Sequence, residues 1–163
     1  MLIMKVMRHL IASIKIIGYK VTNGNKVRFG KGFTFRKSFY LLIDKHGHVE
    51  IGSDCFFNNF CSITCLHSVS IGDGTIFGEG VKIYDHNHKF SNLNKTIKEQ
   101  GFSIGSVHIG NHCWIGTNSV ILKGADIGDN CVIGAGCVVS GKIPSNSIVK
   151  NADNYTIERI EEQ

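Results

Sequence analysis

A branched aliphatic residue returns at every sixth position through much of the second half of the chain. The residues that keep this spacing are Ile109, Ile115, Ile121, Ile127, Ile133 and Val139. A glycine follows directly in the segments "IGNHCW", "IGTNSV", "IGDNCV" and "IGAGCV". A period of six is neither the 3.6 residues of an α-helix nor the two-residue alternation of a flat strand. It indicates short strands joined by turns, each strand sending one aliphatic side chain into a shared interior.

The same spacing occurs less regularly in the first half of the chain. Repeats start at Ile51, Phe57 and Ile63 and, after a slip of two residues, at Ile71 and Phe77, with a weaker trace from Phe29. Coils built from such repeats pair their strands with those of the coils above and below, so that stability comes from stacking between neighbours. We therefore predict an all-β fold, a parallel β-helix of hexapeptide repeats that forms one domain over residues 1–163.

The cysteines follow the repeat as well. Five of the six occupy the small position four residues after the aliphatic: Cys55, Cys61, Cys113, Cys131 and Cys137. Only Cys65 is out of phase, and the sequence contains no CxxC pair. Because a buried free cysteine behaves as a small hydrophobic residue, we interpret these thiols as packing residues rather than disulfide partners or zinc ligands. Reduced thiols favour a cytoplasmic location.

The N-terminal stretch "MLIMKVMRHLIASIKIIGYK" mixes apolar and basic residues. It lacks the uninterrupted apolar run of an export signal, which again points to the cytoplasm. We predict a short amphipathic helix over residues 1–20 that covers one end of the domain, and a peripheral membrane contact through its basic face is an alternative role. The net charge is +5, but no block of five basic residues occurs, so a nucleic-acid partner is not expected.

The repeat fails between Ile83 and Ile109. The segment "YDHNHKFSNLNKTIKEQGFSIGSVH" is polar and has no six-residue phase, so we predict a protruding loop around residues 85–106. It separates first coils over 25–84 from regular coils over 107–150, and a C-terminal segment follows at 151–163. The loop begins with Asp85, His86 and His88, which by themselves fit a metal site, a proton-transfer site or a polar turn.

The segment "IYDHNH", the loop and the following "VHIGNHCWIGTNSV" together resemble the hexapeptide-repeat acyltransferases. The resemblance covers about residues 25–160 and is strongest to sugar O-acetyltransferases, including the maltose and galactoside enzymes and those that modify capsule and O-antigen polysaccharides. It implies a left-handed β-helix and a homotrimer with active sites between subunits. It further implies acetyl-CoA as co-substrate and, as acceptor, a sugar hydroxyl of a cell-surface polysaccharide or its precursor.

Acetyl transfer to a hydroxyl needs a base, because the hydroxyl is a poor nucleophile, and histidine suits this task at neutral pH. The resemblance places His88 in the position of the catalytic base. His86 is the internal rival and is interpreted as a neighbour that shapes the acceptor site. Asp85 could orient an imidazole, as carboxylates do in catalytic triads, or it could stabilise the turn.

The resemblance also assigns residues to the acceptor sugar. Asn58 matches the family position that holds the sugar, and the adjacent Asn59 could exchange roles with it. The sugar-contacting acid that some members carry a few residues later is replaced by "SITC". Trp114, the only tryptophan, falls where the family places an aromatic residue beside the catalytic chamber, and its slot before the interior aliphatic predicts an outward-facing side chain.

For coenzyme A, the resemblance points to the later coils. The Thr117 backbone N–H matches the slot that serves the thioester oxygen, and Gly116 permits close backbone approach. The expected pantetheine contacts are Ala135, Gly136 and Ser140, and the expected phosphate contacts are Lys142, Lys150 and Arg159. The sequence departs from the family where Gly141 precedes Lys142, where "NADN" at 151–154 replaces a GNPA-like turn, and where Tyr155 stands in place of a basic residue.

Three alternatives stay open at this point. The first is N-acetylation of an amino sugar, which needs the same base. The second is a zinc enzyme of the γ-carbonic-anhydrase type, for which the chain offers His86, His88, His108 and His112. The third is a scaffold without catalytic activity. The preferred interpretation expects no metal.

Overall fold

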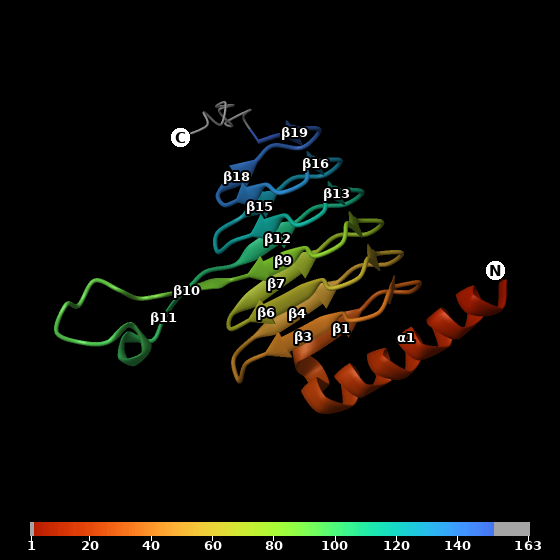
Figure 1. Cartoon of the computed structure of the whole chain (residues 1–163), viewed down its shortest axis with the longest axis horizontal. Helices are drawn as coiled ribbons and strands as arrows, with labels where there is room; N and C mark the ends of the chain where they lie inside the picture. The colour runs from red at the N-terminus through yellow and green to blue at the C-terminus, as the bar shows by residue number, and fades with distance from the viewer. Residues whose placement is uncertain (1, 152–163) are drawn as a thin grey trace, which may run out of the picture.

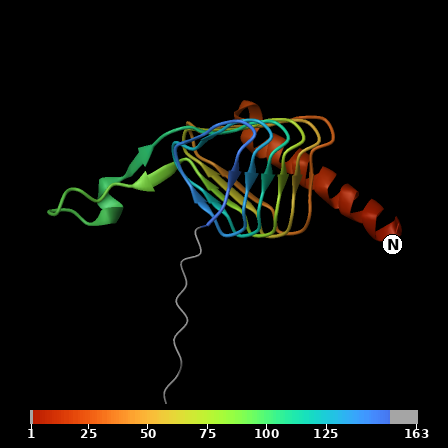
Figure 2. The same cartoon turned by 90° about the horizontal axis from the view of Figure 1, so that it is seen from above.

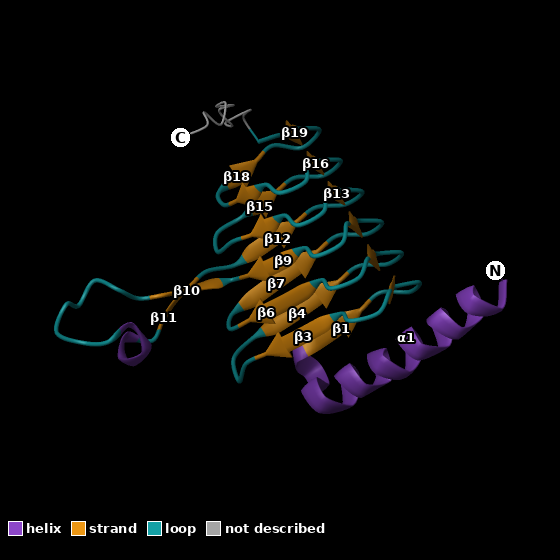
Figure 3. Ribbon diagram, in the orientation of Figure 1, coloured by secondary structure: helices purple, strands orange, loops and turns teal. Residues whose placement is uncertain are grey.

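The structure, a computed structural model, describes residues 2–151 of the chain. Its strands form a stack of about six coils with one helix across the first coil (Figure 1). Each full coil contributes one strand to each of three parallel sheets (Figure 3). The predicted fold class, a parallel β-helix with a short N-terminal helix, is therefore confirmed.

The three sheets are formed by strands that recur in chain order. The first sheet holds β1 (Val27–Phe29), β4 (His48–Ile51), β7 (Ser68–Ile71), β12 (Val107–Ile109), β15 (Asp126–Ile127) and β18 (Lys142–Ile143). The second holds β2 (Thr34–Phe35), β5 (Phe56–Phe57), β8 (Ile76–Phe77), β13 (Trp114–Ile115), β16 (Val132–Ile133) and β19 (Ile148–Val149). The third holds β3 (Tyr40–Ile43), β6 (Ser62–Cys65), β9 (Lys82–Tyr84), β14 (Val120–Ile121) and β17 (Val138–Val139).

The register between coils explains the six-residue period. In the first sheet Ile71 pairs with Ile109, and Ile109 pairs with Ile127, so that equivalent aliphatic residues stack directly on one another. Ile109, Ile115, Ile121, Ile127 and Ile133 are all fully buried. In the first coils the interior is aromatic instead, and the rings of Phe57 and Phe77 stack with centroids 3.9 Å apart.

The small position four residues after each aliphatic has a second role, besides its size. The Cys55 thiol donates to the Gly72 carbonyl oxygen on the next coil at 3.0 Å, and the Ser119 hydroxyl donates to Gly134 at 2.8 Å. Cys61, Cys113 and Cys131 make equivalent contacts to the next coil. All six cysteines are free and buried, as predicted. A cysteine or serine at this position therefore adds a hydrogen bond between coils, whereas Ala125 and Val81 occupy it as small or medium apolar residues.

Helix α1 (Leu2–Asn23) extends three residues beyond the predicted range and is followed by the short 3₁₀ turn η1 (Gly24–Lys26). Ala12 is buried against the first coil, Ile16 packs against the same core, and the Tyr19 hydroxyl donates to the Phe39 carbonyl at 2.9 Å. The helix thus covers the open end of the hydrophobic interior. No helix within residues 2–151 is long and apolar enough to cross a membrane.

Candidate functional site

The predicted loop forms an arm that leaves the stack between the third and the first sheet (Figure 2). Its base is an antiparallel hairpin of β10 (His86–His88) and β11 (Phe102–Ile104), and η2 (Ile97–Gln100) lies near its tip. The Gly105 N–H donates to the Asp85 carbonyl at 2.9 Å, and the Lys123 ammonium donates to the Ser103 hydroxyl. The first contact closes the base of the arm, and the second joins the arm to the coil that follows it.

His86 and His88 lie on the same face of the hairpin, because side chains two residues apart in a strand point to the same side. The Phe102 ring lies beside both imidazoles, with centroid distances of 5.2 Å to His86 and 4.5 Å to His88. The His86 side chain is only 12% exposed, whereas His88 is exposed. The hairpin therefore presents one largely buried imidazole, that of His86, next to one that is accessible to solvent, that of His88.

Asp85 points into the solenoid and is fully buried. Its carboxylate accepts hydrogen bonds from three successive backbone N–H groups of the coil below, those of Leu66, His67 and Ser68, at 2.6–3.0 Å. The Cys65 thiol donates to it at 3.2 Å, and His86 Nδ1 lies 3.1 Å from Asp85 Oδ1. The carboxylate that was expected to orient an imidazole thus contacts His86 and not His88.

The surroundings of Asp85 shift two pKa values in opposite directions. Burial alone raises the pKa of the Asp85 carboxyl, but the hydrogen bonds from Leu66, His67, His86 and Cys65 outweigh it, so that the pKa lies below its usual value. Burial, together with the neighbouring carboxylate, raises the pKa of the Cys65 thiol to about 12. At neutral pH this pair is a carboxylate and a thiol, and the thiol acts as a hydrogen-bond donor.

Polar side chains at the tip of the arm form hydrogen bonds with one another and with the backbone, while apolar side chains there are exposed. The Gln100 amide donates to the Asn92 carbonyl at 3.0 Å, and its oxygen accepts the Asn92 N–H at 2.9 Å. Thr96 donates both its N–H and its hydroxyl to Glu99 Oε2. Phe90 and Leu93 nevertheless remain exposed, Leu93 to 96%. An arm with this surface is suited to contact another protein chain.

The predicted acceptor residues lie away from the edge of the third sheet at which the arm leaves: Trp114 belongs to the second sheet, and Asn58 and Asn59 stand in the turn between the second and third sheets. Asn58 and Asn59 follow β5 and are half-buried, and Asn58 Oδ1 accepts the Asn59 N–H at 2.8 Å. Trp114 opens β13 and is exposed on the outer face, as its slot predicted. Within residues 2–151, no hydrogen bond or aromatic contact joins Trp114 or Asn58 to His88. Within the described part of one chain, the predicted acceptor and base residues therefore do not contact each other directly.

Four of the predicted coenzyme-binding residues do come together. The Gly136 N–H donates to the Thr117 carbonyl at 2.8 Å, so their turns stack at the corner between the second and third sheets. A Cβ on Gly116 would lie 2.5 Å from the Ala135 nitrogen, so the two backbones are in close contact.

The remaining predicted contacts lie elsewhere on the chain. Ser140 and Lys142 are exposed at the corner between the third and first sheets. Lys150 is exposed after the last strand, and Arg159, with most of the "NADN" segment and Tyr155, lies outside the described residues. The coenzyme residues thus border both edges of the third sheet.

Two features of this region were not found from the sequence. The first is the set of backbone N–H groups at 66–68 that bind Asp85. The only indication in the sequence is their separation of 17–19 residues from Asp85, about the length of one coil. The second is Phe60, an exposed aromatic residue in the turn after Asn58 and Asn59 whose φ of 60° is unfavourable for a side chain of this size. Both depend on which residues neighbouring coils bring side by side.

In the part of the chain that the structure describes, no group of three or more His, Cys, Asp or Glu side chains is arranged to hold a metal ion. His108 lies on β12, and its Nδ1 is 2.9 Å from the Ser70 hydroxyl oxygen. His112 stands in the turn before β13. The four histidines considered for a zinc site are thus divided between the arm and the coil that follows it.

Comparison with known proteins gives a consistent set of relatives. Residues 106–141 match the family model described as bacterial transferase hexapeptide (six repeats). The chain is 29% identical over 146 residues to the putative lipopolysaccharide biosynthesis O-acetyl transferase WbbJ of Escherichia coli strain K12, covering 85% of this chain and 74% of that protein. It spans only 33–58% of three further curated relatives that it matches.

Two solved structures resemble the chain in fold. A maltose O-acetyltransferase from Clostridium difficile 630 is 30% identical with a TM-score of 0.60, and the match covers 82% of this chain and 71% of that one. A hexapeptide-repeat acetyltransferase, VCA0836 from Vibrio cholerae O1 biovar eltor, complexed with acetyl coenzyme A, is 24% identical with a TM-score of 0.61, covering 72% and 65%.

Proposed function

Because the chain belongs to the hexapeptide-repeat acyltransferase family, we propose that it transfers an acetyl group from acetyl-CoA to a hydroxyl of a cell-surface polysaccharide or its precursor. The observation that carries this proposal is the hairpin that presents His86 and His88 on one face, at the point where the chain leaves the coil. The six free cysteines suit a reaction in the reducing cytoplasm.

His88 is the proposed general base. It is exposed, so an acceptor can reach its imidazole, whereas His86 is held by Asp85 and largely covered. His88 takes the proton of the sugar hydroxyl as the oxygen attacks the thioester carbon, and the negative charge on the carbonyl oxygen is stabilised by a backbone N–H, for which Thr117 is the candidate. The C–S bond then breaks, and the thiolate leaves with the proton that the imidazolium carried.

The corner formed by Gly116, Thr117, Ala135 and Gly136 fits a slender chain such as pantetheine. Its residues are small, and a side chain at Gly116 has no room. Lys142 and Lys150 are exposed on the last coils, where their ammonium groups suit phosphates. The relative from Vibrio cholerae that was solved with acetyl coenzyme A supports the choice of donor at the level of fold.

We further propose a homotrimer in which the site is completed by a second copy of the chain. The arm leaves between the third and first sheets, whereas Asn58 stands in the turn between the second and third sheets and Trp114 belongs to the second sheet. The exposed Trp114 and Ile76 on that sheet and the exposed Phe90 and Leu93 on the arm are apolar surfaces that an interface would bury. In this arrangement His88 of one subunit faces Asn58 and Trp114 of its neighbour.

The base is tested by comparing His88→Asn with His86→Asn. Release of the coenzyme A thiol from acetyl-CoA is measured with a panel of sugars, and folding is checked by circular dichroism. We expect His88→Asn to lower kcat at least about a hundredfold and His86→Asn to lower it less. The reverse order would assign the base to His86, and turnover unaffected by either variant would refute a histidine base.

The acceptor atom is identified from the chemistry of the product. Mass spectrometry after incubation with acetyl-CoA shows an added acetyl group, and mild alkali removes it from oxygen but leaves it on nitrogen. We expect an alkali-labile acetyl group. An alkali-stable product would replace the proposed acceptor with an amino sugar, and a chain that neither binds acetyl-CoA nor acetylates any sugar would favour the scaffold interpretation.

The shared site is tested by mixing subunits. His88→Asn and Trp114→Ala are each expected to be poorly active alone. When the two are co-expressed in equal amounts, about a quarter of the sites pair an intact His88 with an intact Trp114 from the neighbour, so about a quarter of the wild-type activity should return. No recovery in a mixed oligomer would show that each chain holds its site alone.

A further inference from the structure

Charge is distributed unevenly along the solenoid. Ten of the 18 Lys and Arg residues, but only one of the 13 acidic residues, Asp44, precede Val49. The first 48 residues therefore carry a formal charge of +9 and the remainder −4. Because the coils stack in chain order, this difference in sequence is a difference in space: the end formed by α1 and the first coil is strongly basic.

Helix α1 adds an aliphatic surface to this basic end. Leu10, Ile14, Ile17 and Val21 are 61–78% exposed. Their spacing of four, three and four residues places them in one stripe along the helix, and Ala12, Ile16 and Tyr19 pack on the solenoid from the opposite side. We name Leu10, Ile14, Ile17 and Val21 the outer ridge. No acidic residue occurs anywhere between residues 2 and 23.

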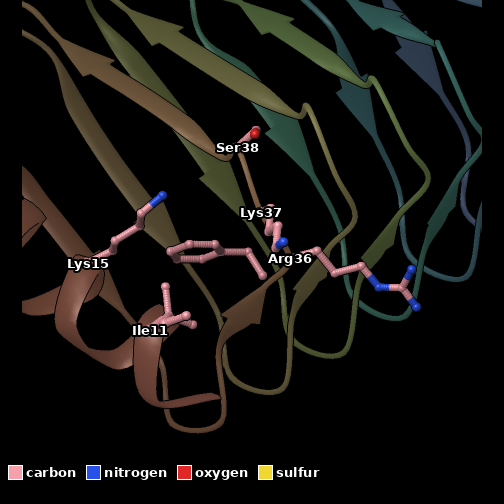
Figure 4. A pocket seen from close by; sticks show the side chains of 7 residues that line it. Ile11, Lys15, Arg36, Lys37 and Ser38 are labelled. Carbon is pink, nitrogen blue, oxygen red and sulfur yellow. The ribbon is translucent and has the colours of Figure 1, made fainter. Parts of the chain in front are cut away.

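A groove with the same mixed character lies between α1 and the first coil (Figure 4). Ile11 and Phe35 supply apolar walls and Lys15 and Lys37 supply ammonium groups, around a volume of about 200 Å³. Lys15, Arg36 and Lys37 are all exposed, and among the described residues none of them forms an ion pair. The Arg36 guanidinium lies over the Phe56 ring, 5.9 Å from its centroid, so within residues 2–151 Lys15 and Lys37 are the free cations at the groove. An apolar groove rimmed by such cations is complementary to an amphiphile with an anionic headgroup.

We propose that the end formed by α1 and the first coil docks on an anionic phospholipid bilayer. The outer ridge enters the boundary between headgroups and acyl chains, while Lys15, Lys20, Arg36 and Lys37 contact lipid phosphates. Charge decides between a bilayer and a second copy as the occupant. Two such ends placed together would oppose like charges, whereas an anionic surface neutralises them. Docking is independent of acetyl transfer and can be measured without it.

The test is co-sedimentation of the full chain with lipid vesicles. One set contains phosphatidylcholine alone, and the other contains about one third phosphatidylglycerol. We expect at least about tenfold stronger partitioning to the anionic vesicles at low salt, with a decrease as the salt is raised, because surface charges are screened. Equal binding to both vesicle types, or binding to neither, would overturn the proposal.

Two variants distinguish insertion of the outer ridge from non-specific adsorption of the protein to vesicles. Ile14→Gln with Ile17→Gln keeps good helix formers in α1 and should reduce partitioning at least about tenfold, because two apolar side chains no longer enter the bilayer. Ile148→Gln, an equally exposed aliphatic residue at the opposite end of the stack, is the matched control and should bind as wild type. A similar loss in both would contradict the assigned orientation.

The same variants distinguish the rival occupant. Light scattering after gel filtration should give the same mass for wild type and for the Ile14→Gln, Ile17→Gln variant, and acetylation of a soluble sugar should be unchanged. A smaller oligomer in that variant would instead show that the outer ridge is covered by another copy of the chain. Vesicle binding without any acetyl transfer would leave the docking intact and refute only the proposed reaction.

Discussion

The buried carboxylate of Asp85 is expected to be the main polar anchor of the arm, and two substitutions measure it. Asp85→Ala removes the acceptor of three backbone N–H groups, those of the half-buried Leu66 and Ser68 and of the exposed His67. An unsatisfied buried donor costs about 1–3 kcal/mol, so the two half-buried donors predict a loss of about 2–6 kcal/mol in the free energy of unfolding, whereas water can replace the carboxylate at His67. Asp85→Asn retains one oxygen and should lose about 1.5–3 kcal/mol, the contribution of hydrogen bonds to a charged acceptor.

The effect of Asp85 depends on pH with a definite sign. The pKa of its carboxyl is lowered in the folded protein, so the folded state is stabilised above the unfolded-state pKa of about 3.9. This stabilisation is lost as the pH falls through the lower, folded-state pKa. Wild type and Asp85→Asn should therefore differ most at pH 7, the gap should begin to shrink as the pH falls to about 4, and it should close only below the folded-state pKa, where both carry an uncharged side chain.

Urea denaturation followed by circular dichroism at several pH values provides the measurement. Unfolding curves at pH 7, 5, 4 and 3 give the free-energy gap between wild type and each variant, and Glu50→Gln, an exposed acid on β4, serves as the control with a small and flat effect. The reasoning is refuted if Asp85→Ala costs less than about 1 kcal/mol, or if the gap to Asp85→Asn stays constant from pH 7 to pH 3.

Three further predictions concern packing and backbone. Gly116→Ala places a Cβ 2.5 Å from a backbone nitrogen of the next coil and should lower the free energy of unfolding, measured with urea, by about 1–3 kcal/mol. The control Gly18→Ala, in open space on α1, should raise it by up to about 1 kcal/mol. Phe60→Asn should raise the melting temperature by the equivalent of about 1 kcal/mol, since asparagine tolerates a φ of 60°; a lower melting temperature would contradict it. Ile115→Ala, at a fully buried position, should cost about 2–5 kcal/mol, and a loss below about 1 kcal/mol would contradict the tight stacking of its column.

The solenoid could be predicted from the sequence because the repeat is a local signal. Each repeat of the 109–139 array can be recognised within six residues of sequence. The stacking of neighbouring coils agrees with this local pattern. The interruption after Ile83 and the outward position of Trp114 were predictable for the same reason. The antiparallel pairing of His86–His88 with Phe102–Ile104 has no such signal, because it joins segments separated by an irregular stretch.

The position of Asp85 shows what a linear pattern does not contain. Its carboxylate contacts the imidazole of His86 and the backbone of residues 66–68 on another coil, and the sequence alone indicates neither partner. Cys65 looked like an exception to the repeat and is in fact the interior neighbour of that carboxylate. Both assignments depend on the coil register, which the two-residue slip before Ile71 obscures.

The buried thiols mark three of the coils, those formed by β4–β6, β12–β14 and β15–β17. Cys55, Cys61, Cys65, Cys113, Cys131 and Cys137 are buried and free from near the bottom of the solenoid to near its top. A thiol reacts with an alkylating reagent only while its own coil is open, so the six alkylation rates, read peptide by peptide, record where the stack separates and in what order. In a solenoid, where each coil depends on its neighbours, such a record would show whether the protein opens from one end or as a single unit.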